Sequence, residues 1–238
     1  MTDAPRTSPL KNARDGIESN PYVHRAMAAL GDAVHPNRLS ALRMLPGLAA
    51  IPAHAAGYPM AAAGLAAFAA LADWADGAAA RASGRFSAEG ARLDPFVDKI
   101  VHGAQMSYLA VLGAASGYAA GQALAVSAAV GIVVDAVLQR ARGPFSAQWS
   151  EAVRAVRDPG SCPRASSPAQ ANFLGKSKFF LQAGGILAVL AAGAGETPCA
   201  VAATGFSAAA VLGAVGGVMR SRAAVAGAAA PSRAIPPK

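Results

Sequence analysis

Four aspartates between residues 73 and 98 are the side chains of this chain whose types and spacing best suit chemistry. Asp73 and Asp76 are three residues apart, and Asp94 and Asp98 are four residues apart. Residues at either spacing share one face of a helix. Each pair therefore directs two carboxylates the same way, and two antiparallel helices would bring the pairs face to face.

Carboxylates that converge in this way repel one another unless positive charge lies between them. A turn marked by Gly84 and Gly90 separates the two pairs, and no histidine or cysteine lies between residues 73 and 98. Ligand sets made only of oxygens suit hard divalent cations such as Mg²⁺ or Mn²⁺. The four aspartates predict a site for two such cations that clamps a phosphoryl group and its leaving group. The alternative is that they are ordinary solvated helix ends.

Two residues beside the second aspartate favour an anionic ligand. Gly77 has no side chain, so a ligand can approach the backbone there. Arg81 follows one helical turn later, and its guanidinium is suited to phosphate oxygens.

The elements that carry these residues belong to a chain poor in charge. Hydrophobic residues make up 54% of the 238 residues and charged residues only 14%, against about 25% in soluble domains. Apolar runs of about 20 residues, the length needed to cross a bilayer as a helix, occur six times. They are Leu39–Tyr58, Pro59–Ala80, Phe96–Tyr118, Ala119–Leu138, Lys176–Ala194 and Pro198–Met219. The pattern predicts an all-α integral membrane protein with six transmembrane helices; an Ala-rich soluble helical bundle is the alternative.

Basic residues are distributed unevenly between the two sides of this predicted topology. The loops on the side of both termini contain Arg81, Arg85, Arg92, Arg140, Arg142, Arg154, Arg157, Arg164, Lys176 and Lys178, whereas the three opposite loops contain no Lys or Arg. Positively charged loops stay in the cytoplasm, so we expect both termini and the aspartates on the cytoplasmic side. Topology signals and contacts with anionic headgroups also account for the net charge of +8, and we expect no nucleic-acid partner.

Three segments follow from these patterns. Residues 1–35 form a polar tail and a short amphipathic helix, which either lies in the headgroup region or packs on the bundle as a surface helix. Residues 36–222 form the six-helix membrane domain, and residues 223–238 form a disordered tail. In the last predicted span, Gly213 and Gly217 make a G-x-x-x-G pair, which packs either within the bundle or between subunits.

The central stretch resembles the signature of the CDP-alcohol phosphotransferase family. The signature D-x2-D-G-x2-A-R-x8-G-x3-D-x3-D is matched at all its fixed positions, which are Asp73, Asp76, Gly77, Ala80, Arg81, Gly90, Asp94 and Asp98. The resemblance implies a six-helix membrane fold, a two-metal site facing the cytoplasm, and binding of a CDP-linked lipid by Gly77, Ala80, Arg81 and Gly90. It also implies a homodimer in a bacterial inner (plasma) membrane.

Three further stretches are similar to those of phosphatidylglycerophosphate synthases within that family. They are "HPNRLSALRMLP" from His35, "LDPFVDK" from Leu93 and "LGKSKFFLQ" from Leu174. The similarity implies transfer of a phosphatidyl group from CDP-diacylglycerol to glycerol 3-phosphate with release of CMP. Asp98, the last aspartate of the signature, is the candidate general base for the acceptor hydroxyl. Cardiolipin synthases carry similar stretches, so phosphatidylglycerol is an alternative acceptor, as are inositol phosphate and serine.

An acceptor that bears its own phosphate requires a cationic pocket. The candidates are Arg43, Arg140, Lys176 and Lys178. The chain departs from phosphatidylglycerophosphate synthases in its fourth predicted span, where Val134-Asp135 replace their usual Arg-Glu pair. Asp135 is interpreted in three ways: it bonds the acceptor, orients a basic residue, or pairs with Arg140.

The same acidic residues would also suit a protein that is not an enzyme. Acidic side chains within a membrane also occur in ion-conducting transporters, and an inactive membrane scaffold could retain them. The intact spacing of the signature favours the enzyme.

Overall fold

The structure is a computed structural model that describes residues 16–85, 87–141, 143–159 and 173–229. Within these ranges the structure contains helices and no strands, as the sequence predicts. In chain order the helices are α2 Pro21–Ala33, α3 Pro36–Leu42, α4 Met44–Ala55, α5 Pro59–Ser83, α6 Ala88–Ala115, α7 Ala119–Arg140, α8 Phe145–Arg157, α9 Phe173–Ala192 and α10 Glu196–Ala229.

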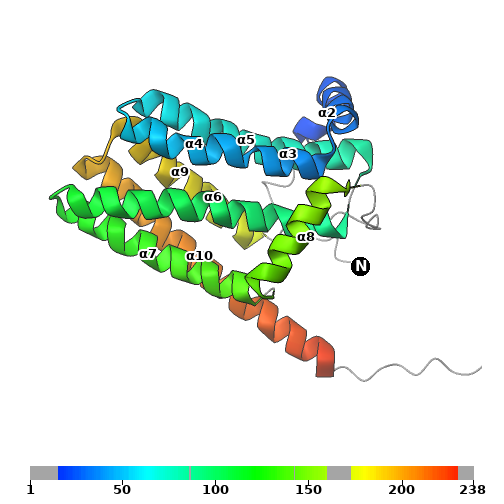
Figure 1. The fold of residues 1–238 in the computed structure, drawn as a ribbon. Coiled ribbons are helices and arrows are strands. Elements are labelled where there is room, and N and C mark those ends of the chain that lie inside the picture. The colour runs from blue at the N-terminus through cyan, green and yellow to red at the C-terminus, as the bar shows by residue number, and fades with distance from the viewer. Residues whose placement is uncertain (1–15, 86, 142, 160–172, 230–238) are drawn as a thin grey trace, which may run out of the picture.

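The long helices run side by side and form a bundle (Figure 1). Helix α10 packs against α7 and α9, α6 packs against α7, and α4 packs against α5. Helices α2 and α8 lie at one end of the bundle (Figure 1). The short turns at residues 56–58, 116–118 and 193–195 lie at the other end.

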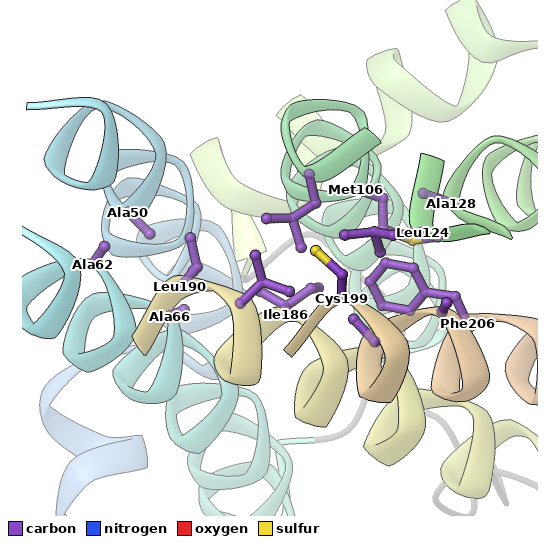
Figure 2. Packing of buried hydrophobic residues seen from close by; sticks show 14 residues of the cluster. Ala50, Ala62, Ala66, Met106, Leu124, Ala128, Ile186, Leu190, Cys199 and Phe206 are labelled. Carbon is purple, nitrogen blue, oxygen red and sulfur yellow. The ribbon is translucent and has the colours of Figure 1, made fainter. Parts of the chain in front are cut away.

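Small side chains let the helices approach one another in the core (Figure 2). Ala50, Ala62 and Ala66 of α4 and α5 are buried in one cluster with Ile186 of α9 and Phe206 of α10. Because alanine adds little width to a helix, the backbones come close and the larger side chains fill the space between them. The high alanine content that lowers the hydropathy of each run is thus what allows tight packing.

The G-x-x-x-G pair packs within the chain. A side chain at Gly217 would begin 2.7 Å from Leu138 Cδ2, and one at Gly213 would begin 3.2 Å from Val134 Cγ1. Both contacts are with α7, so the pair forms the seam between α10 and α7.

Two described helices are long and apolar enough to cross a membrane, Ala119–Arg140 and the part of α10 from Glu196 to Met219, and the apolar stretch Ser177–Ala192 is shorter. The helices at the other predicted spans are not long and apolar enough to meet this criterion, for identifiable reasons. The span from Leu39 is divided into α3 and α4 at Arg43, while α5 and the beginning of α6 carry the charged residues of the signature. Six spans therefore remain a prediction.

Pro46 explains the division at Arg43. A proline has no N–H to donate to the carbonyl four residues earlier, here that of Leu42, and its ring crowds that carbonyl. Helix α3 accordingly ends at Leu42, and α4 begins at Met44.

Helix α8 is absent from the sequence-based prediction, which treated this segment as a basic loop. It is amphipathic: Ala152 and Ala155 are buried, and the rings of Phe145 and Trp149 lie 5.3 Å and 6.2 Å from that of Phe96 on α6. A search for apolar runs of about 20 residues does not detect a short helix with one apolar face.

The N-terminal helix was predicted, and α2 packs on the end of α5. A side chain at Gly31 would begin 2.9 Å from the carbonyl oxygen of Ala79. Arg85 donates to the Gly31 carbonyl at 2.7 Å and pairs with Asp32 at 3.1 Å.

Near the C-terminus, α10 continues to Ala229, whereas the sequence analysis ended the membrane domain at residue 222. Residues 230–238 lie outside the described ranges.

A backbone contact between α6 and α7 supplies a test of this packing. A methyl group at Gly113 would begin 2.5 Å from the carbonyl oxygen of Gly121, whereas one at Gly103, on the same helix, would meet nothing within 4 Å. We expect Gly113→Ala to lower the midpoint of thermal unfolding in detergent, because a backbone carbonyl cannot move aside. The matched control Gly103→Ala should leave the midpoint unchanged or raise it, since alanine favours a helix over glycine by about 1 kcal/mol. Equal midpoints for the two variants would contradict the α6–α7 packing.

Candidate functional site

The two aspartate pairs come from the end of α5 and the beginning of α6. Helix α5 ends at Ser83 and is capped by Gly84, whose φ of 67° suits glycine. Helix α6 begins after Ser87, whose hydroxyl accepts from the Gly90 amide at 2.9 Å. One carboxylate oxygen from each of Asp73, Asp76 and Asp94 lies within 4.8 Å of the others. Three of the four aspartates, drawn from both pairs, therefore meet in the structure.

The guanidinium of Arg43 lies among all four aspartates. It forms an ion pair with Asp73, its Nη2 lies 3.2 Å from Asp94 Oδ1 and 3.1 Å from Asp98 Oδ1, and its Nε lies 4.0 Å from Asp76 Oδ2. Arg43 is only 4% exposed. Arg43, which the sequence analysis places inside the first predicted span and lists among the site residues, lies at the break between α3 and α4.

The site can accommodate further positive charge. Four carboxyl groups face one guanidinium, so the acidic groups outnumber the basic ones by three. Asp76 is 2% exposed, and its Oδ2, like Arg43 Nε, has no hydrogen-bond partner among the described residues. A buried carboxylate oxygen without a partner is costly, and a bound cation would satisfy it. The donor set thus fits divalent metal ions.

Gly90 serves the packing of α3 onto α6 and lies inside the first turn of α6, not in the connecting turn that the sequence predicted. A side chain there would begin 2.5 Å from Asn37 Oδ1. Asn37 is buried, and its amide donates to the Ala155 carbonyl at 3.1 Å. The same face of α3 thus contacts both α6 and the end of α8.

Helix α8 joins α3, which ends directly before Arg43, to α6, which carries Asp94. Arg38 on α3 donates to the Val156 carbonyl at 3.2 Å, and Arg92 on α6 pairs with Glu151 at 3.0 Å. Because carbonyls at the end of a helix lack intrahelical donors, the contacts from α3 complete the C-terminal turn of α8. Helix α8 therefore fixes α3 against the beginning of α6.

Arg81 points toward α2. Its Nε and Nη2 lie 2.7 Å and 2.5 Å from the two carboxylate oxygens of Glu18, and its guanidinium lies over Gly77, where an added Cβ would be 3.2 Å from Nη1. Val23 and Met27 of α2 and Ala78 and Ala82 of α5 line a cavity beside this pair. Glu18, in the segment before α2, was not among the predicted site residues, and nothing in its spacing relates it to the signature. Ala80, one turn after Asp76, is half-buried on the same helix.

A second cavity lies beside Asp98, deeper in the bundle. It is bounded by Arg43 and Asp73 on the aspartate side and by His102, Gln105 and Phe179 on the other. His102 and Gln105 are buried, and the rings of His102 and Phe179 lie 5.3 Å apart. Asp73 and Asp98 are thus the two aspartates that line this cavity.

The four residues predicted to bind an acceptor phosphate are not gathered in one place. Arg43 lies among the aspartates, and Arg140 is exposed at the end of α7. Lys178 is buried and forms an ion pair with Asp135, so Asp135 orients a basic residue, and its ionic partners are lysines. The side chain of Lys176 lies outside the described part of the structure.

His35 caps α3 at the edge of this site. Its Nδ1 accepts from the Asn37 amide at 3.3 Å. Burial lowers the pKa of His35, and the neighbouring charges of Arg85 and Arg38 lower it further. The ring therefore stays neutral near pH 7, as its role as acceptor requires.

Comparison with known proteins agrees with this geometry. The model of the CDP-alcohol phosphatidyltransferase family matches residues 33–216 of the chain. No curated protein and no solved structure matches it. The matched range begins before α3 and ends within α10, so it contains all four aspartates and Arg43.

Direct cation binding tests the aspartate cluster. We expect the purified protein to bind Mn²⁺, measured by electron paramagnetic resonance, and Asp76→Asn to weaken binding. Changes to residues that only support metal ligands cost about 10–100-fold in affinity, so loss of a buried ligand should cost at least as much. Asp32→Asn, which removes an exposed carboxylate of α2, should bind Mn²⁺ as the unaltered protein does. Equal Mn²⁺ affinity in all three proteins would refute the prediction of a metal site at the aspartates.

Proposed function

The chain belongs to the CDP-alcohol phosphatidyltransferase family, and we propose that it transfers a phosphatidyl group from CDP-diacylglycerol to glycerol 3-phosphate. The products are phosphatidylglycerophosphate and CMP. Transfer from a CDP-linked alcohol to an acceptor follows from the family, whereas the donor lipid and the acceptor are our proposal. The observation that carries it is the arrangement of four signature aspartates around one buried arginine.

The aspartates would hold the metal ions. In this proposal Asp73, Asp76 and Asp94, with Asp98 beside them, bind two divalent cations, Mg²⁺ or Mn²⁺. When bound, such ions neutralise the diphosphate and the charge that develops on the departing CMP.

Asp98 would act as the general base. It lines the inner cavity and is held by Arg43 at 3.1 Å, so one carboxylate oxygen has a fixed direction. The acceptor hydroxyl gives its proton to Asp98 as its oxygen forms a bond to the phosphorus that bears diacylglycerol. The bond from that phosphorus to the bridging oxygen breaks, and CMP leaves with the electron pair.

Arg43 would set the geometry of the reaction. Its contacts reach aspartates on both helices, so it fixes α5 relative to α6 at the reacting centre. Orientation of this kind lowers the barrier because the groups are in place before reaction. Gly77, Ala80, Arg81 and Gly90 would form the CDP-lipid side of the site, where a diphosphate oxygen can replace a Glu18 oxygen as partner of Arg81.

The proposal places the site at the cytoplasmic face of a bacterial inner (plasma) membrane. Six spans with both termini in the cytoplasm would put the aspartates at the same end of the bundle as Arg85, Arg92 and Arg154. The turns at the other end, residues 56–58, 116–118 and 193–195, contain no Lys or Arg. This asymmetry supports the orientation. We expect a homodimer, because the resemblance to the family implies one.

An acceptor panel tests the reaction. Purified protein given CDP-diacylglycerol and Mg²⁺ should release CMP with glycerol 3-phosphate and not without an acceptor, and chelation with EDTA should stop release. Release only with phosphatidylglycerol would indicate a cardiolipin synthase, and release only with inositol phosphate or serine would indicate another acceptor class. No release with any of the four would favour a scaffold or transporter.

Substitution of Asp98 tests its role. We expect Asp98→Asn to lower kcat by roughly 10²- to 10⁴-fold, the usual worth of a general base, because an amide cannot accept the proton. Binding of CDP-diacylglycerol, measured by protection against thermal unfolding, should change little. Asp158→Asn, at the end of α8, serves as a control and should retain full turnover. An unchanged kcat in Asp98→Asn would show that Asp98 is not the general base.

A further inference from the structure

Arg81, a residue of the signature, binds a carboxylate of its own chain. Its Nε and Nη2 lie 2.7 Å and 2.5 Å from the two carboxylate oxygens of Glu18. Two parallel contacts of this kind are also the arrangement in which a guanidinium binds a phosphate. Glu18 therefore holds Arg81 in the way that a phosphate group of a substrate would hold it.

The rest of the Arg81 guanidinium faces the backbone of α5. A Cβ at Gly77 would lie 3.2 Å from Nη1 and 3.6 Å from Nη2, so the group lies close over Gly77. A guanidinium presents its donors as a planar fork, and here one edge of the fork is directed to Glu18 while Nη1 lies at Gly77. A phosphate that Arg81 is to bind through two contacts has to take the place of Glu18.

The ion pair is partly shielded from water. The side chains of Arg81 and Glu18 are 27% and 17% exposed. Charges that are partly buried are screened less than charges on an open surface, and a pair with two parallel contacts is stronger than one with a single contact. Glu18 is thus an effective competitor for any anion that Arg81 binds.

Glu18 lies in a short turn before α2. Residues 16–18 are helical, and Asn20 caps the beginning of α2. The far end of α2 is tied to α5, because Arg85 donates to the Gly31 carbonyl at 2.7 Å. The two ends of α2 are therefore held by different contacts, and only the contact at Glu18 involves a residue of the signature at its phosphate-binding edge.

Helices α2 and α5 are less closely packed near Glu18. A cavity lined by Val23 and Met27 of α2 and by Ala78 of α5 lies beside the ion pair. Regions with fewer packed contacts open at a lower cost in free energy than closely packed ones. The turn at residues 16–20 can thus leave Arg81 while the far end of α2 stays on α5.

We infer that Glu18 competes with the diphosphate of the CDP-linked donor for Arg81, so that the turn at residues 16–20 leaves Arg81 when the donor binds. The inference rests on the proposed function, in which Arg81 contacts the donor. A protein whose binding-competent state is only partly populated binds its ligand less tightly by that fraction. Glu18 thus lowers the affinity for the donor and takes no part in the transfer.

Two other roles for Glu18 would have different consequences. If Glu18 oriented Arg81 toward the donor, its loss would raise KM for the donor. If the ion pair only fastened the N-terminal turn to α5, its loss would lower thermal stability and leave that KM unchanged. Only competition predicts that removal of the carboxylate improves donor binding.

The experiment compares Glu18→Gln with the control Asp32→Asn, which removes the carboxylate that pairs with Arg85 between the same two helices. With saturating glycerol 3-phosphate and Mg²⁺, we expect Glu18→Gln to lower KM for CDP-diacylglycerol about three- to tenfold, with kcat within about twofold. Asp32→Asn should leave both values unchanged. An unchanged or higher KM in Glu18→Gln would overturn the inference, as would an equal decrease in Asp32→Asn.

A second measurement does not need turnover. In the presence of Mg²⁺, CDP should bind more tightly to Glu18→Gln than to the unaltered protein, as measured by isothermal titration calorimetry. In an Arg81→Gln background, Glu18→Gln should have no such effect, because the competition acts through Arg81. An equal gain of affinity in both backgrounds would overturn the inference.

Hydrogen exchange reports the movement itself. Backbone amides of residues 16–20 should exchange faster when CDP and Mg²⁺ are bound to the unaltered protein, because the turn has left Arg81. Amides around Gly31, at the anchored end of α2, should not exchange faster. Slower exchange at residues 16–20 would show that the turn closes over the donor, and slower or unchanged exchange there would overturn the inference.

The outcomes separate this inference from the proposed function. Tighter CDP binding in Glu18→Gln, together with no CMP release from any acceptor, would support the competition and refute the transfer. CMP release with glycerol 3-phosphate, together with equal KM for CDP-diacylglycerol in Glu18→Gln and the unaltered protein, would do the reverse. No binding of CDP to either protein and no CMP release would refute both.

Discussion

The guanidinium of Arg43 and the carboxylates around it attract one another across three helices, and the rest of the site depends on this attraction. Asp73 and Asp76 come from α5, Asp94 and Asp98 from α6, and the arginine from the break between α3 and α4. Like charges at these separations would drive α5 and α6 apart if nothing positive lay between them. A single guanidinium offsets part of that repulsion, and the charge that remains makes the same place attractive to divalent cations.

Several packing features keep these three helices in register. Gly90 lets Asn37 approach α6, and Asn37 and Arg38 bond the last carbonyls of α8. Helix α8 in turn packs its aromatic side chains on Phe96, which lies midway along the chain between Asp94 and Asp98. A glycine of the signature thus has a packing role at the periphery of the site, in addition to any contact with the lipid substrate.

The interior contains two groups of charged side chains, both of which involve α6. In one group four aspartates surround Arg43. In the other, Asp135 forms ion pairs with Lys99 and Lys178. Asp98 and Lys99 are neighbours in sequence but belong to different groups, because successive residues of a helix point about 100° apart.

The sequence by itself determined the helical class, the two aspartate pairs and the family, because helical spacing and apolar run length are local properties that survive without any knowledge of packing. It also placed Gly77 beside Arg81. Only the tertiary structure decided the partners: Glu18 for Arg81, Lys99 and Lys178 for Asp135, and α7 for Gly213 and Gly217. It also decided that Arg43 stands at a helix break and that the basic loop contains α8. These pairings join residues that are tens of positions apart in the sequence. They depend on which helices become neighbours in the fold, and no local pattern of residues encodes that choice.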